Sequence, residues 1–190
     1  MICDEVQTGF GRTGKLMGSE WDLGDGVRPD IMCLGKAISA GITPVSGILA
    51  NDEVMMTIAP GDHGSTYGGN ALGMAIARAA VEALVEEDMV GNSLRVGAHL
   101  EAGLKSLNSP LISEVRARGL FAGLEFKEGH GVDGNDFAKL LFKNGIITKA
   151  THEMTVRFTP ALVVTTEEID NAMEIIRHSM TELEAKATGI

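Results

Sequence analysis

The pattern of hydrophobic and polar positions changes near residue 90 of the chain. Before this point, short apolar runs at 1–3, 31–34 and 45–49 alternate with glycine-rich turns, which is typical of parallel strands covered on both faces. A segment over 70–88 follows, and its first turns are apolar nearly all round. The pattern therefore predicts buried strands and then a helix packed on their sheet.

After residue 90 the elements indicate a smaller α+β unit. The pattern predicts a helix, then a strand with alternating apolar positions, and then a second helix over 136–144. A capping box at 165–168 marks the start of the last helix. The apolar positions that carry these predictions are Val96, Leu100, Leu104 and Leu107, then Leu120, Ala122, Leu124 and Phe126, and finally Ile169, Met173, Ile176, Met180 and Leu183. We expect an α/β protein with two domains, 1–90 and 91–190.

Composition and charge narrow the function classes. The chain has 190 residues, 44% of them hydrophobic, and its net charge of −10 disfavours nucleic acid and an anionic membrane surface as partners. Cys3 and Cys33 each lie in an apolar run, which favours buried thiols and a reducing compartment over a disulfide. No apolar run approaches the roughly 20 residues of a membrane span, and the first residues do not resemble a signal peptide.

The first two candidate functional residues follow strand-like runs. Asp4 ends the first run, where a buried carboxylate needs a partner, although a turn or capping aspartate is an equal alternative. Lys36 follows the run at 31–34 among small residues, and burial there favours a nucleophilic amine. Taken alone, a solvated lysine at a strand end is the commoner case.

The other two candidates indicate anion binding. The stretch GDHGSTYGGN at 61–70 carries Ser65 and Thr66 before a helix start, which suits a phosphate, although a plain turn with an N-cap is the alternative. In TVRFTP, alternation places Arg157 on the face opposite Val156 and Phe158. Arginine suits a substrate carboxylate, whereas a surface arginine on an edge strand is the simpler interpretation.

Together these four sites indicate one bound assembly, pyridoxal phosphate with an amino acid. The ordered series DEVQTGFGRTG, RPDIMCLGKAISAG, PGDHGSTYGGN and VRFTPAL resembles the class III (fold-type I) pyridoxal phosphate aminotransferases over essentially the whole chain. Within this class, GDHGSTYGGN and KATHEMTVRFTPAL are most similar to the ornithine-type enzymes. The resemblance implies part of a large domain with a mostly parallel sheet at 1–90 and a small α+β domain at 91–190.

The resemblance also implies roles for individual residues. Lys36 is the expected covalent anchor and acid/base, and Asp4 the partner of the pyridine nitrogen. Gln7 matches a position near the ring hydroxyl. Ser65 and Thr66 match a turn that reaches the phosphate of the neighbouring subunit, which implies a homodimer with shared active sites. Arg157 matches the residue that binds the α-carboxylate of the substrate, and no metal ion is expected.

The implied reaction moves the δ-amino group of ornithine to 2-oxoglutarate, giving glutamate semialdehyde, which cyclises to pyrroline-5-carboxylate, and glutamate. Alternatives are an acetylornithine or 4-aminobutyrate aminotransferase, or a non-catalytic remnant that pairs with a homologue. The family carries a long N-terminal half ahead of DEVQTG, so we expect this chain to be a C-terminal half with little or no activity alone. The expected compartment is the cytoplasm, or the mitochondrial matrix if a transit peptide lies in that preceding half.

Overall fold

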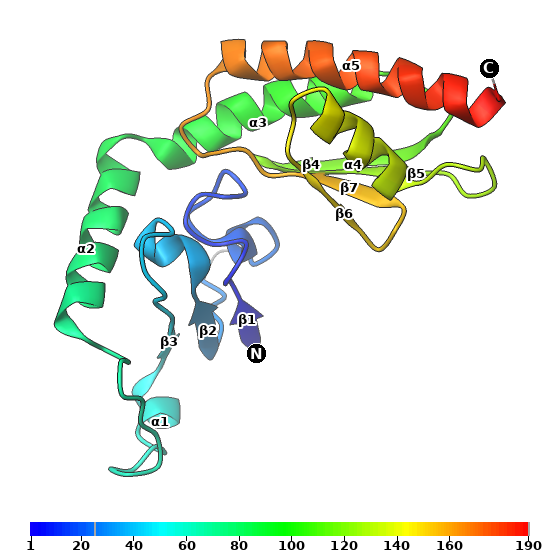
Figure 1. The fold of residues 1–190 in the computed structure, drawn as a ribbon. Coiled ribbons are helices and arrows are strands. Elements are labelled where there is room, and N and C mark those ends of the chain that lie inside the picture. The colour runs from blue at the N-terminus through cyan, green and yellow to red at the C-terminus, as the bar shows by residue number, and fades with distance from the viewer. Residues whose placement is uncertain (25, 190) are drawn as a thin grey trace. The chain divides into compact units, whose positions relative to one another are not determined.

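The computed structural model describes residues 1–24 and 26–189, which form two compact units, Met1–Gly91 and Asn92–Ile190 (Figure 1). Each unit contains a sheet of its own. Among the described residues, no helix combines the length and the apolar character needed to cross a bilayer.

The first unit contains a mixed sheet in the order β1-β2-β3, whose strands are β1 (Ile2–Asp4), β2 (Ile31–Leu34) and β3 (Gly47–Ala50). β1 pairs with β2 in parallel, but β3 runs antiparallel to β2, so the prediction of a third parallel strand is wrong. The link from β2 to β3 holds the 3-10 helix η2 (Lys36–Ser39) and then turns at Ala40 and Gly41, whose φ values are 51° and 77°. It has no full crossover helix of the kind that joins most parallel strands.

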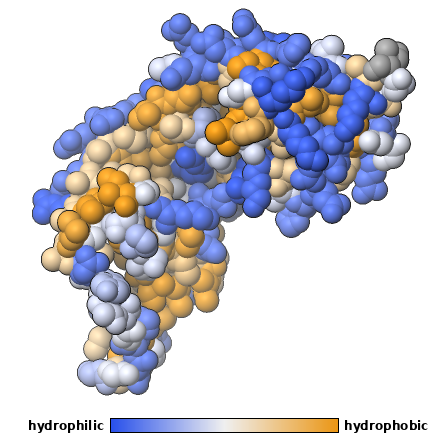
Figure 2. All heavy atoms as spheres, in the orientation of Figure 1, coloured by the Kyte–Doolittle hydropathy of each residue, from blue (hydrophilic) through white to orange (hydrophobic). Residues whose placement is uncertain are grey.

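The strands of the first unit are not covered on both faces as predicted. Ile2, Ile48 and Leu49 are 65%, 44% and 58% exposed, and Cys3 and Cys33 are free and only half-buried. Figure 2 shows hydrophobic surface over the region of this sheet. Apolar runs identify strands, but burial depends on neighbouring elements, and none of the unit's described elements buries these side chains.

Two short helices, η1 (Gly18–Trp21) and α1 (Asp52–Met55), precede the long helix α2 (Ala71–Glu86). The side chain of Asn70 caps α2 by accepting a hydrogen bond of 2.8 Å from the backbone N–H of Gly73. The helix was predicted to pack on the sheet, but it contacts chiefly η2, and Leu72 is 71% exposed. The helix prediction is therefore confirmed, whereas its predicted burial is wrong.

The second unit has a four-stranded antiparallel sheet in the order β4-β5-β7-β6. Its elements, in chain order, are α3 (Met89–Lys105, which starts just before the unit boundary), β4 (Ile112–Arg118), β5 (Phe121–Phe126), α4 (Gly134–Lys143), β6 (Lys149–Thr151), β7 (Thr155–Phe158) and α5 (Thr166–Thr188). The sequence did not predict β4 or β6, because β4 is rich in charges and irregular between Ile112 and Glu114, and β6 has only three residues.

The core of the second unit lies between α3, α4 and α5 and one face of this sheet (Figure 1). The alternation predicted for β5 and the apolar stripe predicted for α5 are confirmed, since all of their named side chains are buried. The capping box is present as well: the Thr165 hydroxyl accepts a hydrogen bond of 3.2 Å from the N–H of Glu168. The opposite face of the sheet therefore carries the polar side chains, among them Arg157.

Candidate active site

Asp4 and Lys36 follow the carboxyl ends of two paired strands. Asp4 ends β1 and is the register partner of Cys33, and Lys36 lies three residues beyond Cys33. Because β1 and β2 run in parallel, their carboxyl ends lie at the same edge of the sheet, which is where ligands bind in open α/β sheets. The two residues that the sequence singled out are thus brought to one sheet edge.

Both side chains at this edge are exposed, so the prediction that Asp4 and Lys36 are buried is wrong for this chain. Asp4 accepts a hydrogen bond of 3.0 Å from the N–H of Val6. Lys36 adopts a left-handed φ of 44°, an uncommon conformation for a residue with a side chain and one that is enriched at functional sites. An exposed carboxylate and an exposed amine at one edge are accessible to a ligand that carries opposite charges.

The turn after β1 is held by Glu5, which the sequence analysis did not single out. Glu5 is 2% exposed, and its carboxylate accepts hydrogen bonds of 2.9 and 2.6 Å from the N–H groups of Gly18 and Ser19 and a third from the Thr8 hydroxyl. Burial alone raises the pKa of Glu5, but the hydrogen bonds from Ser19, Thr8 and Gly18 outweigh it, and the pKa lies below its ordinary value.

Glu5 is therefore the ionised anchor of the segment on which Asp4 and the half-buried Gln7 are carried. In the sequence, the two adjacent acidic residues Asp4 and Glu5 were the signal that a functional carboxylate lies at this position. Local sequence could not tell which of the two is buried, because the two backbone donors to Glu5 lie 13 and 14 residues further along.

Ser65 and Thr66 lie in an exposed turn ahead of α2. The Ser65 hydroxyl accepts a hydrogen bond of 3.1 Å from the N–H of Gly68, while the Thr66 side chain is open to solvent. Both interpretations of this segment, a capped turn and an anion-binding turn, agree with this geometry.

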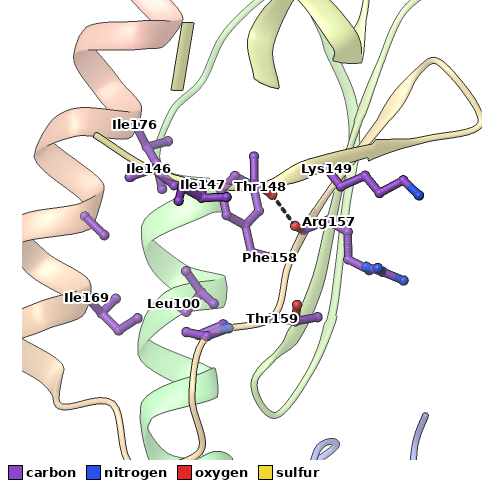
Figure 3. Close-up of a pocket in the computed structure, with 12 residues that line it drawn as sticks. Leu100, Ile146, Ile147, Thr148, Lys149, Arg157, Phe158, Thr159, Ile169 and Ile176 are labelled. Atoms are coloured by element: carbon purple, nitrogen blue, oxygen red, sulfur yellow. Dashed lines mark hydrogen bonds between the residues drawn. The ribbon is translucent and has the colours of Figure 1, made fainter. Parts of the chain in front are cut away.

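Arg157 lies on β7, which is an inner strand, so the alternative of an arginine on an edge strand is wrong. Its register partners are Gly123 on β5 and Lys149 on β6, and its carbonyl oxygen accepts a hydrogen bond of 2.6 Å from the Thr148 hydroxyl. Arg157 and Lys149 line a pocket of about 370 Å³ within the second unit (Figure 3).

The residues of the first unit fit pyridoxal phosphate by their chemistry. The cofactor requires an amine for covalent attachment and an anion for its ring nitrogen, and Lys36 and Asp4 supply both from one sheet edge. Hydroxyls and backbone amides at Ser65 and Thr66 are suitable phosphate donors. Among the described residues, no group of three or more His, Cys, Asp or Glu is arranged to hold a metal ion.

The model of the aminotransferase class-III family matches residues 1–180. The chain belongs to this family. It is 44% identical over 177 residues to ornithine aminotransferase 2 of Staphylococcus aureus, an alignment that covers 93% of this chain and 43% of that protein. The chain thus spans less than half the length of the curated relatives it matches. The cofactor of class III aminotransferases is pyridoxal phosphate, as the resemblance implied.

Solved structures of the family share the fold. An ornithine δ-aminotransferase of Plasmodium falciparum matches with a TM-score of 0.89 at 44% identity, covering 95% of this chain and 46% of that one. The ornithine aminotransferase of Toxoplasma gondii matches with a TM-score of 0.90 at 39% identity, covering 97% and 44%. An acetylornithine aminotransferase of Elizabethkingia anophelis matches with a TM-score of 0.87 at 37% identity, covering 95% and 47%. The expected fold class, a fold-type I aminotransferase, is confirmed.

Proposed function

We propose that this chain carries the lysine, aspartate and arginine of a pyridoxal phosphate-dependent ornithine aminotransferase. The observation that carries the proposal is the position of Asp4 and Lys36 beyond the carboxyl ends of paired parallel strands. We assign residues 1–90 to the C-terminal part of the cofactor-binding large domain and residues 91–190 to the small domain.

Each residue has a defined task in this proposal. The Lys36 amine attaches the cofactor and moves a proton to and from the reacting carbon of the substrate. The Asp4 carboxylate keeps a proton on the ring nitrogen, and Gln7 contacts the ring hydroxyl. The bound cofactor supplies an electron-poor ring that takes up the electron pair of the broken C–H bond. In a homodimer, Ser65 and Thr66 bind the phosphate group of the cofactor in the partner subunit's site. Arg157 binds the substrate carboxylate.

The proposed donor is the δ-amino group of ornithine, and the proposed acceptor is 2-oxoglutarate. The names of the relatives support ornithine, and the match to an acetylornithine aminotransferase makes that substrate the second candidate. The products with ornithine are glutamate semialdehyde, which cyclises to pyrroline-5-carboxylate, and glutamate. We place the reaction in the cytoplasm, in agreement with the free thiols of Cys3 and Cys33.

Chemical trapping tests the cofactor site directly. The chain is incubated with pyridoxal phosphate and reduced with borohydride, and the pyridoxyl group is located by peptide mass spectrometry. We expect one adduct at Lys36, absent in Lys36→Ala and reduced in Asp4→Ala but not in the control Lys127→Ala. Labelling spread evenly over surface lysines would contradict the assignment of Lys36.

Turnover by the isolated chain is a separate question. We expect little or no aminotransferase activity, because the chain spans less than half the length of its relatives. The assay couples ornithine and 2-oxoglutarate to formation of pyrroline-5-carboxylate, with Lys36→Ala as the background. Activity above this background would refute the expectation, and comparison of ornithine, acetylornithine and 4-aminobutyrate would then identify the donor. Absence of turnover together with labelling spread over several lysines would favour a non-catalytic remnant.

A further inference from the structure

The sheet of the first unit exposes apolar residues on both of its faces. Register partners across β1, β2 and β3 point to the same face, and successive partners alternate between the two faces. Ile2 and Ile48 therefore lie on one face, and Leu49 lies on the other. These residues are 65%, 44% and 58% exposed, so none of the unit's described helices buries them.

Both edges of this sheet are open as well. The order β1-β2-β3 leaves the outer backbone edges of β1 and β3 without a partner strand in the described part of the chain. β3 has the sequence GILA, which contains no charged residue and no proline. Charged residues and proline are the usual means by which natural edge strands avoid pairing with another chain. The edge of β3 is therefore free to accept a further strand.

The sheet of the second unit is covered quite differently. Three helices cover one of its faces, and the other face carries charged residues such as Arg116 and Glu125, which form an ion pair. A sheet with such an alternating pattern needs cover on one face only, whereas strands that are apolar on both faces occur in sheets covered on both. The first unit has the second pattern without the cover. Uncovered apolar surface of this kind marks an interaction site.

The length of the relatives indicates what covers this sheet. The chain corresponds to 43% of ornithine aminotransferase 2 of Staphylococcus aureus, so the family has further polypeptide that this chain does not match. A second copy of the chain is a poorer occupant. A two-fold contact uses one patch twice, so it would cover one edge or one face and leave the others open. Strands and helices of the same large domain can cover both edges and both faces.

We propose that the sheet of the first unit binds the N-terminal half of a class III aminotransferase as a separate polypeptide. Strands of this partner pair with the outer edges of β1 and β3, and its helices cover the two faces at Ile2, Ile48 and Leu49. The inference goes beyond the proposed function, because it concerns association and not transamination. It rests on family membership and on the sheet, and on no catalytic residue.

Coexpression tests this pairing. The chain of 190 residues is coexpressed with the part of the S. aureus protein that precedes its match to this chain. The complex is purified through a tag on that partner half, and its stoichiometry is measured by light scattering. We expect one copy of each polypeptide. Hydrogen exchange at the amides of β1 and β3 should slow about tenfold or more in the complex, whereas the amides of β5 should be unchanged.

Two variants place a charge on opposite faces of the sheet, Ile2→Lys and Leu49→Lys. Both residues are exposed in the chain alone, so each variant should fold like the native chain, which circular dichroism checks. Each should reduce the amount of chain that copurifies with the partner half about tenfold, because the added charge would be buried in the complex. Phe142→Lys is the control, since Phe142 is 68% exposed on α4 of the second unit. It should leave copurification unchanged.

The part of the S. aureus protein that matches this chain is the positive control for the partner half. Copurification of that part but not of this chain would overturn the proposal, and so would equal losses in Leu49→Lys and Phe142→Lys. A homodimer that Leu49→Lys abolishes and that the partner half does not dissociate would make a second copy the occupant instead. Because this test needs neither cofactor nor turnover, failure of Lys36 labelling and failure of this pairing are separate results.

Discussion

The backbone N–H of Ser19 donates a hydrogen bond of 2.6 Å to the carboxylate of Glu5, the residue that directly follows β1. Glu5 is 2% exposed, and its own N–H donates to the carbonyl oxygen of Cys33 on β2 at 2.9 Å. Glu5 therefore links the end of β1 to Gly18 and Ser19, at the far end of the segment that follows, and to the neighbouring strand β2. Asp4 lies immediately beside this anchor.

Glu5→Gln should loosen this turn. The amide keeps one acceptor oxygen, so the N–H of Gly18 or Ser19 loses its partner, at a cost of about 2 kcal/mol. The expected result is faster hydrogen exchange at the amides of Gly18 and Ser19. The exposed Glu87→Gln is the matched control and should leave these amides unchanged. Equal protection in the two variants would show that Glu5 does not anchor the turn.

The same anchor predicts a response to acid. Hydrogen bonds hold the pKa of Glu5 below its ordinary value of 4.5 against the opposing effect of burial. A lowered folded-state pKa contributes stability that is complete above the unfolded pKa and is lost as the pH falls through the folded pKa. Protection factors at Ser19 should therefore fall as the pH drops below about 4.5. In Glu5→Gln this pH dependence should be absent.

Gly97→Ala should destabilise the second unit. A Cβ atom at Gly97 on α3 would overlap the backbone of Gly119 in the β4–β5 turn, and backbone atoms cannot move aside cheaply. We expect a loss of roughly 2 kcal/mol or more in the free energy of unfolding, measured by urea denaturation. Gly103→Ala is the control, because it lies on the same helix and its Cβ meets only the flexible side chain of Met173 at 3.0 Å. Similar losses in both variants would rule out the close approach as the cause.

The two units should differ in local stability. The buried apolar side chains of the first unit are Phe10, Leu34, Ala77 and Leu84, whereas the second unit has a continuous core between its sheet and three helices. Stability against local opening follows buried apolar contacts. Amides of β5 and α5 should exchange slowly, and those of β1 and β3 quickly. Equal protection in both sheets would contradict this expectation.

A single substitution tests whether the apolar stripe of α5 is packed in the core. Ile176 is completely buried, so Ile176→Ala should cost about 2–4 kcal/mol through lost burial and the cavity that remains. Glu174→Ala, at an exposed position of the same helix, should change stability by less than 0.5 kcal/mol, as is usual for surface substitutions. Urea denaturation followed by circular dichroism measures both. Equal effects would mean that the α5 stripe is not a packed core face.

Local sequence predicted those elements whose signal lies within a few residues. The stripe from Ile169 to Leu183 and the cap at Thr165 specify α5, because helical period and capping are local properties. The alternation around Leu124 likewise specifies β5 and its buried face. The charged strand β4 escaped prediction, because its place in the sheet comes from its pairing with β5 and not from its own pattern.

For the candidate site as well, some features could be predicted from the sequence and others depend on the tertiary structure. The sequence by itself determined, through its resemblance to a family, the family and the fold class, both of which are confirmed, and it singled out Asp4, Lys36 and Arg157 as candidate site residues, which stay predictions. Only the tertiary structure decided that Glu5 is the buried carboxylate, that β3 runs antiparallel, and that Lys149 lies beside Arg157. Strand direction, register and burial arise from pairing between distant segments, and no local period in the chain encodes which segment will be the partner.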